Sequence, residues 1–218
     1  MKHLPLLLLL LAACAAVFAA QPGQPAPTLD MLLKDLAGDN GPVQARARQL
    51  LPRHGTAALP GLVALLGDER DHVWRTAAMV IKDVSQQPAA VVMGGETPAP
   101  ARRAVLDALL PCIDPDRPKP LVERALAILP LVVDEETDIA PVAALLDNAD
   151  LRDRAKAALQ EAGTSKALHA IAGAAAQTAN ADFQCALLAA LFDKQPKLGA
   201  DAWFAAKLLE SPWPKVRA

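Results

Sequence analysis

The chain has 218 residues, of which 53% are hydrophobic, 21% are charged and 3% are aromatic, and its formal net charge is −2. The high apolar content excludes a disordered chain, and alanine and leucine, which both favour helices, supply most of it. The nearly neutral charge gives no electrostatic reason to expect nucleic acid or an anionic membrane surface as a partner.

The N-terminus predicts an export signal. A short basic start precedes an apolar stretch over residues 4–20, which is rich in leucine and then in alanine. We expect a cleaved signal peptide over residues 1–19.

Residues 11–14, Leu-Ala-Ala-Cys, also resemble a bacterial lipobox, in which Cys14 would carry a lipid, and this alternative stays open. An uncleaved signal is a further alternative. In each case the protein is predicted to leave the cytoplasm for the periplasm or envelope of a bacterium, and only the lipid or the uncleaved signal would hold it to a membrane.

After a proline- and glycine-rich tether over residues 20–27, the sequence predicts a series of helix pairs. The expected pairs are 29–36 with 42–53, 60–66 with 71–84, 101–113 with 119–131, 140–146 with 151–162, and 165–175 with 181–194. A sixth pair begins over 200–209 and breaks off at Ala218 soon after its second helix would start. The chain is therefore expected either to end in a shortened cap or to be a fragment of a longer protein.

An insertion over about residues 85–100 separates the second pair from the third. Its prolines and double glycine argue against helix. Long irregular loops in compact arrays are often binding elements, and the apolar run Val91, Val92 and Met93 makes this one a candidate. The alternative is a tolerated loop that folds onto its own repeat.

The second helix of each pair repeats one apolar pattern. Its anchor positions are Val43, Val73, Leu121, Leu151 and Ala181. Four residues after each anchor comes a small residue, namely Ala47, Ala77, Ala125, Ala155 and Cys185. Eight residues after each comes another apolar one, namely Leu51, Ile81, Leu129, Leu159 and Ala189. The anchors are 30, 48, 30 and 30 residues apart, and such a period is typical of stacked repeat proteins.

These residues, and the segment from Leu145 to Leu159 in particular, resemble the HEAT repeat. The likeness is strongest to the short, roughly 30-residue HEAT-like repeats of phycobilisome lyases and many bacterial repeat proteins. It covers about residues 28–218. The resemblance implies an all-α fold of the armadillo-like superhelix type, an α-solenoid of about five and a half stacked antiparallel helix pairs, with the second helices lining a concave face.

The family's arginine early in the second helix is matched by Arg152 and Arg217. At the other equivalent positions the chain has Gln44, Trp74, Val122 and Asp182. If the second helices line a concavity, they present a mixed, partly basic surface. Its candidate partner-binding residues are Arg46, Trp74, Arg75, Arg124, Arg152 and Arg154. The alternative is an ordinary solvated face with Trp74 half buried between repeats.

Groups of residues with catalytic or ligating chemistry are scarce. The serines lie beside turns, and the histidines show no metal-ligand spacing, so no catalytic residue, cofactor or metal is expected. Cys112 and Cys185 lie two repeats apart, which is too far for a disulfide, and both are predicted to be buried thiols.

The sequence therefore predicts a non-enzymatic scaffold that binds another protein in the bacterial envelope. A second hypothesis is that the array is the repeat domain of a longer exported enzyme or electron-transfer protein. A lyase-like activity, by analogy with the phycobilisome lyases, is the third, and export argues against it because pigment attachment in the cytoplasm needs no signal peptide.

Overall fold

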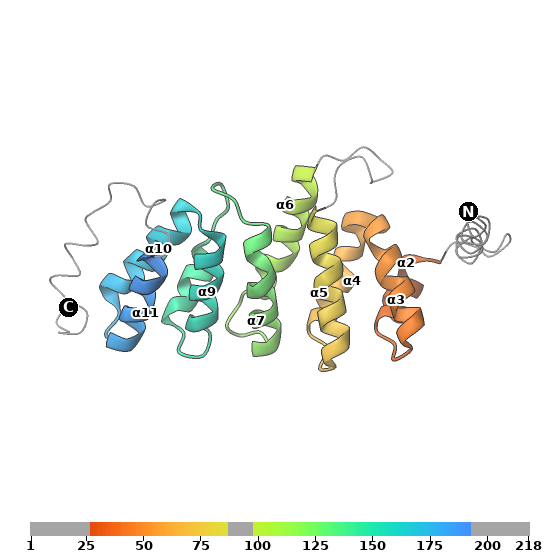
Figure 1. Ribbon diagram of the computed structural model, residues 1–218, viewed down its shortest axis with the longest axis horizontal. Coiled ribbons are helices and arrows are strands. Elements are labelled where there is room, and N and C mark those ends of the chain that lie inside the picture. The colour runs from red at the N-terminus through yellow and green to blue at the C-terminus, as the bar shows by residue number, and fades with distance from the viewer. Residues whose placement is uncertain (1–26, 87–97, 193–218) are drawn as a thin grey trace, which may run out of the picture.

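The computed structural model describes residues 27–86 and 98–192, and every regular element in these ranges is a helix. The helices form five antiparallel pairs that stand side by side along the long axis of the molecule (Figure 1). The predicted all-α solenoid is thus confirmed. The predicted signal peptide, Cys14, the run from Val91 to Met93 and the predicted sixth pair lie outside the described residues.

The first helices of the five pairs are α2 (Leu29–Leu36), α4 (Leu59–Leu66), α6 (Pro98–Leu109), α8 (Ala140–Ala144) and α10 (Ser165–Gln177). The second helices are α3 (Gly41–Leu50), α5 (Asp71–Gln86), α7 (Lys119–Ile128), α9 (Arg152–Ala162) and α11 (Ala181–Phe192). Short 3₁₀ segments continue α3, α6, α7 and α8 as η1 (Leu51–Ala58), η3 (Leu110–Cys112), η4 (Leu129–Leu131) and η5 (Leu145–Asp147). The first three contain a proline near their start, which removes an α-helical hydrogen bond and tightens the turn.

The predicted insertion is shorter than its sequence suggests. Helix α5 continues to Gln86, and α6 already begins at Pro98, so both ends of the expected loop over 85–100 are helical. The prolines at the start of α6 are compatible with helix because the first turn has no intrahelical partner for their missing N–H groups.

Asparagine side chains bond to the backbone at the start of three second helices, at the N-termini of α3 and α11 and within the turn before α9. The side-chain oxygens of Asn40, Asn148 and Asn180 accept hydrogen bonds from the backbone N–H groups three residues later, at distances of 3.4, 3.2 and 2.9 Å. In α11 this cap places Phe183, rather than the predicted Ala181, at the anchor position. The anchor of α11 therefore lies two residues later than the 30-residue period predicts. The turn before α11 spans only residues 178–180, so the extra length lies in the 13-residue helix α10.

This shift corrects the predicted pattern of the fifth repeat. Phe183, Leu187 and Leu191 are buried in α11, whereas Cys185 is only half-buried and Ala189 is exposed. The prediction of two buried thiols therefore holds only for Cys112, where burial raises the pKa of the thiol.

The predicted small residues lie in the core of the other four repeats. Ala47, Ala77, Ala125 and Ala155 all have 0% exposure. The apolar residues eight positions after each anchor are buried in the same core, which runs continuously from α2 to α11. Neighbouring pairs thus share one apolar interior, as stacked repeats do.

Polar contacts between turns also join successive repeats. Arg70 lies 3.4 Å from Asp39, and Lys119 lies 3.4 Å from Asp150, each across about one repeat length. Glu135 accepts a hydrogen bond of 2.9 Å from the backbone N–H of Ser165 at the start of α10. Among the described helices, none is long and apolar enough to cross a membrane.

Candidate protein-binding surface

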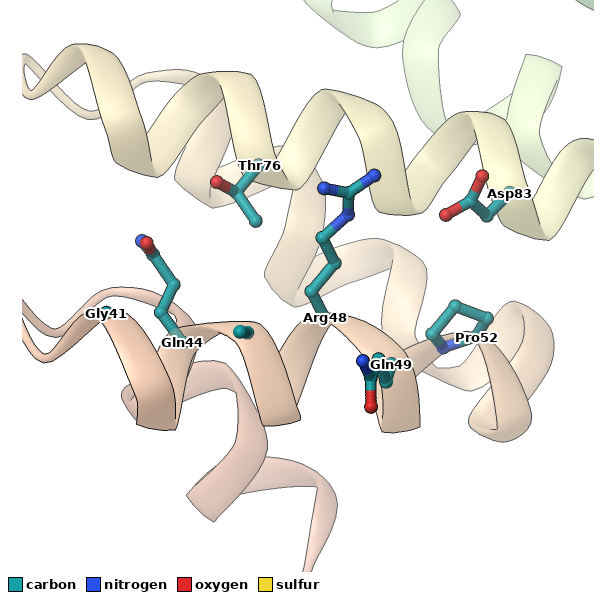
Figure 2. A pocket seen from close by; sticks show the side chains of 8 residues that line it. Gly41, Gln44, Arg48, Gln49, Pro52, Thr76 and Asp83 are labelled. Atoms are coloured by element: carbon teal, nitrogen blue, oxygen red, sulfur yellow. The ribbon is translucent and has the colours of Figure 1, made fainter. Parts of the chain in front are cut away.

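An open groove of about 520 Å³ lies between the neighbouring second helices α3 and α5 (Figure 2). Its lining residues are Gly41, Gln44, Ala45, Arg48, Gln49 and Pro52 from α3 and the start of η1, and Thr76 and Asp83 from α5. We call this site the α3/α5 groove.

The α3 side of the groove follows from helix periodicity. The lining positions follow Gly41 at three, four, seven, eight and eleven residues, which is the helical repeat, so they form one stripe along the same face of the helix. Gly41 and Ala45 are small, and only Ala47 of α3 is buried. This face of α3 therefore carries small and polar residues instead of bulky apolar side chains that would pack against α5.

The polar groups of the groove fall into two kinds. Gln44 donates from Nε2 to the carbonyl oxygen of Leu36 at 2.9 Å, and Thr76 donates from Oγ1 to the carbonyl oxygen of His72 at 2.6 Å. Arg48 extends from α3 toward α5, and the Asp83 carboxylate on α5 points to the side on which Arg48 lies (Figure 2). Within the described ranges, neither charge takes part in an ion pair.

The next space along the stack, between α5 and α7, contains a cluster of Trp74 with two arginines. The guanidinium carbon of Arg124 lies 4.5 Å from the centroid of the Trp74 ring, and that of Arg75 lies 5.0 Å from it. Arg124 also donates from Nη1 to the carbonyl oxygens of Leu66 at 2.7 Å and Asp68 at 2.8 Å. It thereby joins α7 to the end of α4.

Asp71 completes this cluster. Its carboxylate accepts a hydrogen bond of 3.1 Å from Trp74 Nε1 and pairs with Arg75 at 3.2 Å. The hydrogen bond from Trp74, with the positive charge of Arg75, lowers the pKa of Asp71. The cluster is thus an internally satisfied network of one aromatic ring, two cations and one anion.

The turn between α4 and α5 carries a second charge pair beside the cluster. Asp68 accepts hydrogen bonds from the side chain and the backbone N–H of Arg70, at 2.9 to 3.0 Å. The side-chain hydrogen bond from Arg70 is the main cause that lowers the pKa of Asp68 to about 2. This carboxylate therefore stays ionised over the whole physiological range.

The two spaces are built from equivalent positions of the repeat. One residue after the anchor, Gln44 in α3 corresponds to Trp74 in α5, and five residues after it, Arg48 corresponds to Ala78. On the facing helix, Thr76 of α5 corresponds to Arg124 of α7. Ala78 packs partly against the core, whereas Arg48 is exposed. The α5/α7 space is therefore filled where the α3/α5 groove is open.

The structure brings together three of the predicted binding residues, namely Trp74, Arg75 and Arg124. Arg46 on α3 and Arg154 on α9 are exposed and lie in other repeats. Arg152 is half-buried, with its guanidinium carbon 4.8 Å from the centroid of the Phe183 ring. Its Nε is buried without a hydrogen-bond partner in the described part of the chain.

The corrected register also changes which residue of α11 is equivalent to Arg152, the arginine at the start of α9. In α11 the residue equivalent to Arg152 is Gln184, not Asp182. Gln184 donates from Nε2 to the carbonyl oxygen of Ala175 at 2.7 Å, as Gln44 does to Leu36. The first and last described repeats thus use the same amide contact to join their two helices.

Arg48, Gln49 and Asp83 were not among the binding residues predicted from the sequence. The three- and four-residue spacing of the α3 stripe was a usable signal for the first two, because it places them on one helix face. No comparable signal marks Asp83, since its place opposite Arg48 depends on how α5 stacks against α3.

A second hollow, of about 590 Å³, lies between η3 and η5 at the ends of first helices. It is mainly apolar and includes Pro111, Pro115 and Pro141. Nothing in the structure shows what covers it. Across the described ranges, no group of three histidine, cysteine, aspartate or glutamate side chains could hold a metal ion.

Known proteins with a similar arrangement of helices include the complex of CpcE and CpcF of phycocyanin lyase from a Nostoc species. That structure shares 19% sequence identity with this chain, with a TM-score of 0.44, and the match covers 92% of this chain and 76% of the other. An engineered protein is similar at 17% identity and a TM-score of 0.37, over 88% of this chain and 93% of the other. No family model and no curated protein matches the chain.

The comparison corrects the prediction that this protein is not an enzyme. A helical repeat array similar to this one belongs to a phycocyanin lyase, so a repeat fold is no ground for excluding an enzymatic role. The likeness concerns the arrangement of helices, and it assigns no reaction to any residue of this chain.

Proposed function

We propose that this chain is a protein-interaction scaffold, exported to the bacterial envelope, whose partner lies along the second helices. The observation that carries the proposal is the α3/α5 groove, which stays open at positions where the next interface is filled. Export is supported by the signal-like sequence of residues 1–19.

The composition of the groove favours a protein as the ligand. Pockets for small molecules are mostly concave and apolar, with few polar groups. This groove instead offers one cation, one anion and two amides along an open surface. Such mixed polarity matches a polypeptide, whose backbone presents both donors and acceptors. The near balance of charges gives no attraction for a nucleic acid backbone.

The filled α5/α7 space supports the same proposal in another way. A binding groove needs rigid walls, because side chains that must be ordered on binding reduce the affinity. Arg124 connects α7 to the end of α4 and stacks on Trp74 of α5. The helix that forms one wall of the groove is thereby held on its other side.

Site-specific photo-crosslinking in cells of the source organism tests this function. A photoreactive amino acid would replace Gln49 in the groove or, as the matched control, Lys34 on the exposed face of the first helix α2. We expect a protein adduct from position 49 and none from position 34, in the envelope fraction. Equal adducts from both positions, or none from either, would contradict the proposed scaffold role.

A further inference from the structure

We infer that the α3/α5 groove binds an extended peptide segment of about five residues, which places an acidic side chain against Arg48 and a basic one against Asp83. The inference rests on the proposed scaffold function and specifies the chemistry of the partner. Its basis is the length, the polar lining and the charge arrangement of the groove.

The length of the groove sets the length of the segment. The lining stripe runs from Gly41 to Pro52, and at 1.5 Å per residue this is about 16 Å along the helix. An extended chain advances about 3.3 Å per residue, so about five residues span the groove.

The polar lining of the groove favours an extended chain over a helix. A helix that binds in a groove lays an apolar stripe against an apolar lining, whereas an extended chain offers backbone donors and acceptors along its length. The groove presents Arg48, Gln49 and Asp83 to a ligand, and its apolar lining residues are Ala45 and Pro52. A single extended chain is therefore the better match.

The two charges set the pattern of the segment. Gln44 lies across from Thr76, about one turn of α3 from Gly41 at the end of the groove (Figure 2). Measured from this pair, Arg48 lies about 6 Å along α3, and Asp83 lies about 10 Å along α5. The offset of about 4 Å corresponds to one or two residues of an extended peptide. The matching acidic and basic residues are therefore expected one or two positions apart.

The free charges make this pairing favourable. Elsewhere in the described chain, Arg70, Arg75 and Arg103 each pair with an aspartate. Arg48 and Asp83 face the groove without such partners, so a ligand does not have to break an existing ion pair to reach them. Each contact is expected to change the affinity by about 3- to 10-fold.

Selection from a displayed library of random hexapeptides tests the inference on the purified protein. We expect enrichment of sequences with one acidic and one basic residue at most two positions apart. A selected, fluorescently labelled hexapeptide should bind at least about 10-fold more weakly to Ala45→Trp, whose indole would fill the groove. Arg48→Gln should remove the preference for the acidic residue only, and Asp83→Asn the preference for the basic residue only.

A charge-swapped variant, Arg48→Asp with Asp83→Arg, provides the matched control. Both positions are exposed, so the fold is expected to be retained, and the exchange leaves the net charge unchanged. The selected peptides should reverse the order of their charges. Melting of each variant, followed by circular dichroism, verifies that it is folded.

The inference is overturned if no peptide is enriched, if selected peptides bind Ala45→Trp as tightly as the parent, or if the charge variants select unchanged sequences. Such a result together with crosslinks from position 49 would remove the peptide inference and leave the scaffold function intact. Absence of crosslinks from position 49 would remove the scaffold function itself.

Discussion

Between α3 and α5, Gln44 and Thr76 face each other across a groove, whereas at the equivalent positions between α5 and α7 Trp74 stacks with Arg124. The backbone arrangement of the two spaces is the same repeat. The difference therefore comes from side-chain volume and from the hydrogen bonds that each side chain makes. Arg124 is committed to two carbonyl groups, while Arg48, in the other space, is exposed and unpaired in the described chain.

The contrast teaches which part of a repeat array is structural and which is available for binding. An arginine on a second helix is not by itself a binding residue, because its partners decide its role. The α5/α7 cluster stabilises the stack, and the α3/α5 groove leaves charges for a ligand. Four sets of substitutions test this distinction.

The largest expected effect is at the buried small positions. Ala77→Leu should lower the free energy of unfolding by about 1–3 kcal/mol, because Ala77 has 0% exposure and a larger side chain would force the helices apart. Ala45→Leu, on the exposed side of α3, should change it by less than about 0.5 kcal/mol. Urea unfolding measures both, and similar values for the two variants would show that the register is wrong.

The second largest loss of stability is expected when the Arg124 guanidinium is removed. Arg124→Gln should destabilise the protein by about 1–2 kcal/mol, since two hydrogen bonds to carbonyl groups and the stacking on Trp74 are lost. The matched control is Arg154→Gln at the equivalent position of α9, where the side chain is exposed and a change within about 0.5 kcal/mol is expected. An equal loss in both variants would assign Arg124 an ordinary surface role.

A double-mutant cycle tests the coupling directly. Trp74→Ala and Arg124→Ala should show a coupling of about 0.5–1 kcal/mol in chemical unfolding, as expected for a cation stacked on an indole ring. The equivalent cycle of Gln44→Ala and Thr76→Ala should give a value near zero, because each side chain bonds to a separate backbone carbonyl. A coupling in the second cycle as large as in the first would remove the distinction between the two spaces.

The smallest expected effect is a change in how the free energy of unfolding depends on pH in the acid range. The folded-state pKa of Asp68, about 2, lies below its ordinary value of 3.8. The stabilisation from this carboxylate is therefore present above about pH 4 and is lost as the pH falls toward 2. Because Arg70 is exposed, solvent screening keeps the effect below about 1 kcal/mol. Asp68→Asn should unfold with a weaker pH dependence between pH 4 and 2, and an unchanged dependence would contradict the pairing.

The sequence was sufficient to predict the stacked helix pairs because the positions of the small and apolar residues determine which helix faces can approach. Ala47, Ala77, Ala125 and Ala155 illustrate this, since they are fully buried. The register of α11 was predicted wrongly because that helix is rich in alanine and leucine, which makes several alignments look acceptable. The cap at Asn180 decides among them.

The candidate site was less accessible to prediction. Trp74 was expected as an anchor for a partner, yet it is half-buried, and its Nε1 and its ring face already have contacts within the chain. The sequence does not reveal which polar side chains have internal partners, because those partners come from neighbouring repeats. Arg124, for example, bonds to residues more than fifty positions away.

The central claim, an open groove beside a filled one, can be tested by thiol labelling at equivalent positions. In a protein with Cys112 and Cys185 replaced by serine, Arg48→Cys should react with a thiol reagent at the rate of an exposed cysteine, and Ala78→Cys at least about 10-fold more slowly because its site packs against the core. A selected hexapeptide should protect only the cysteine at position 48. Equal labelling rates at the two positions, or protection of neither, would contradict the account.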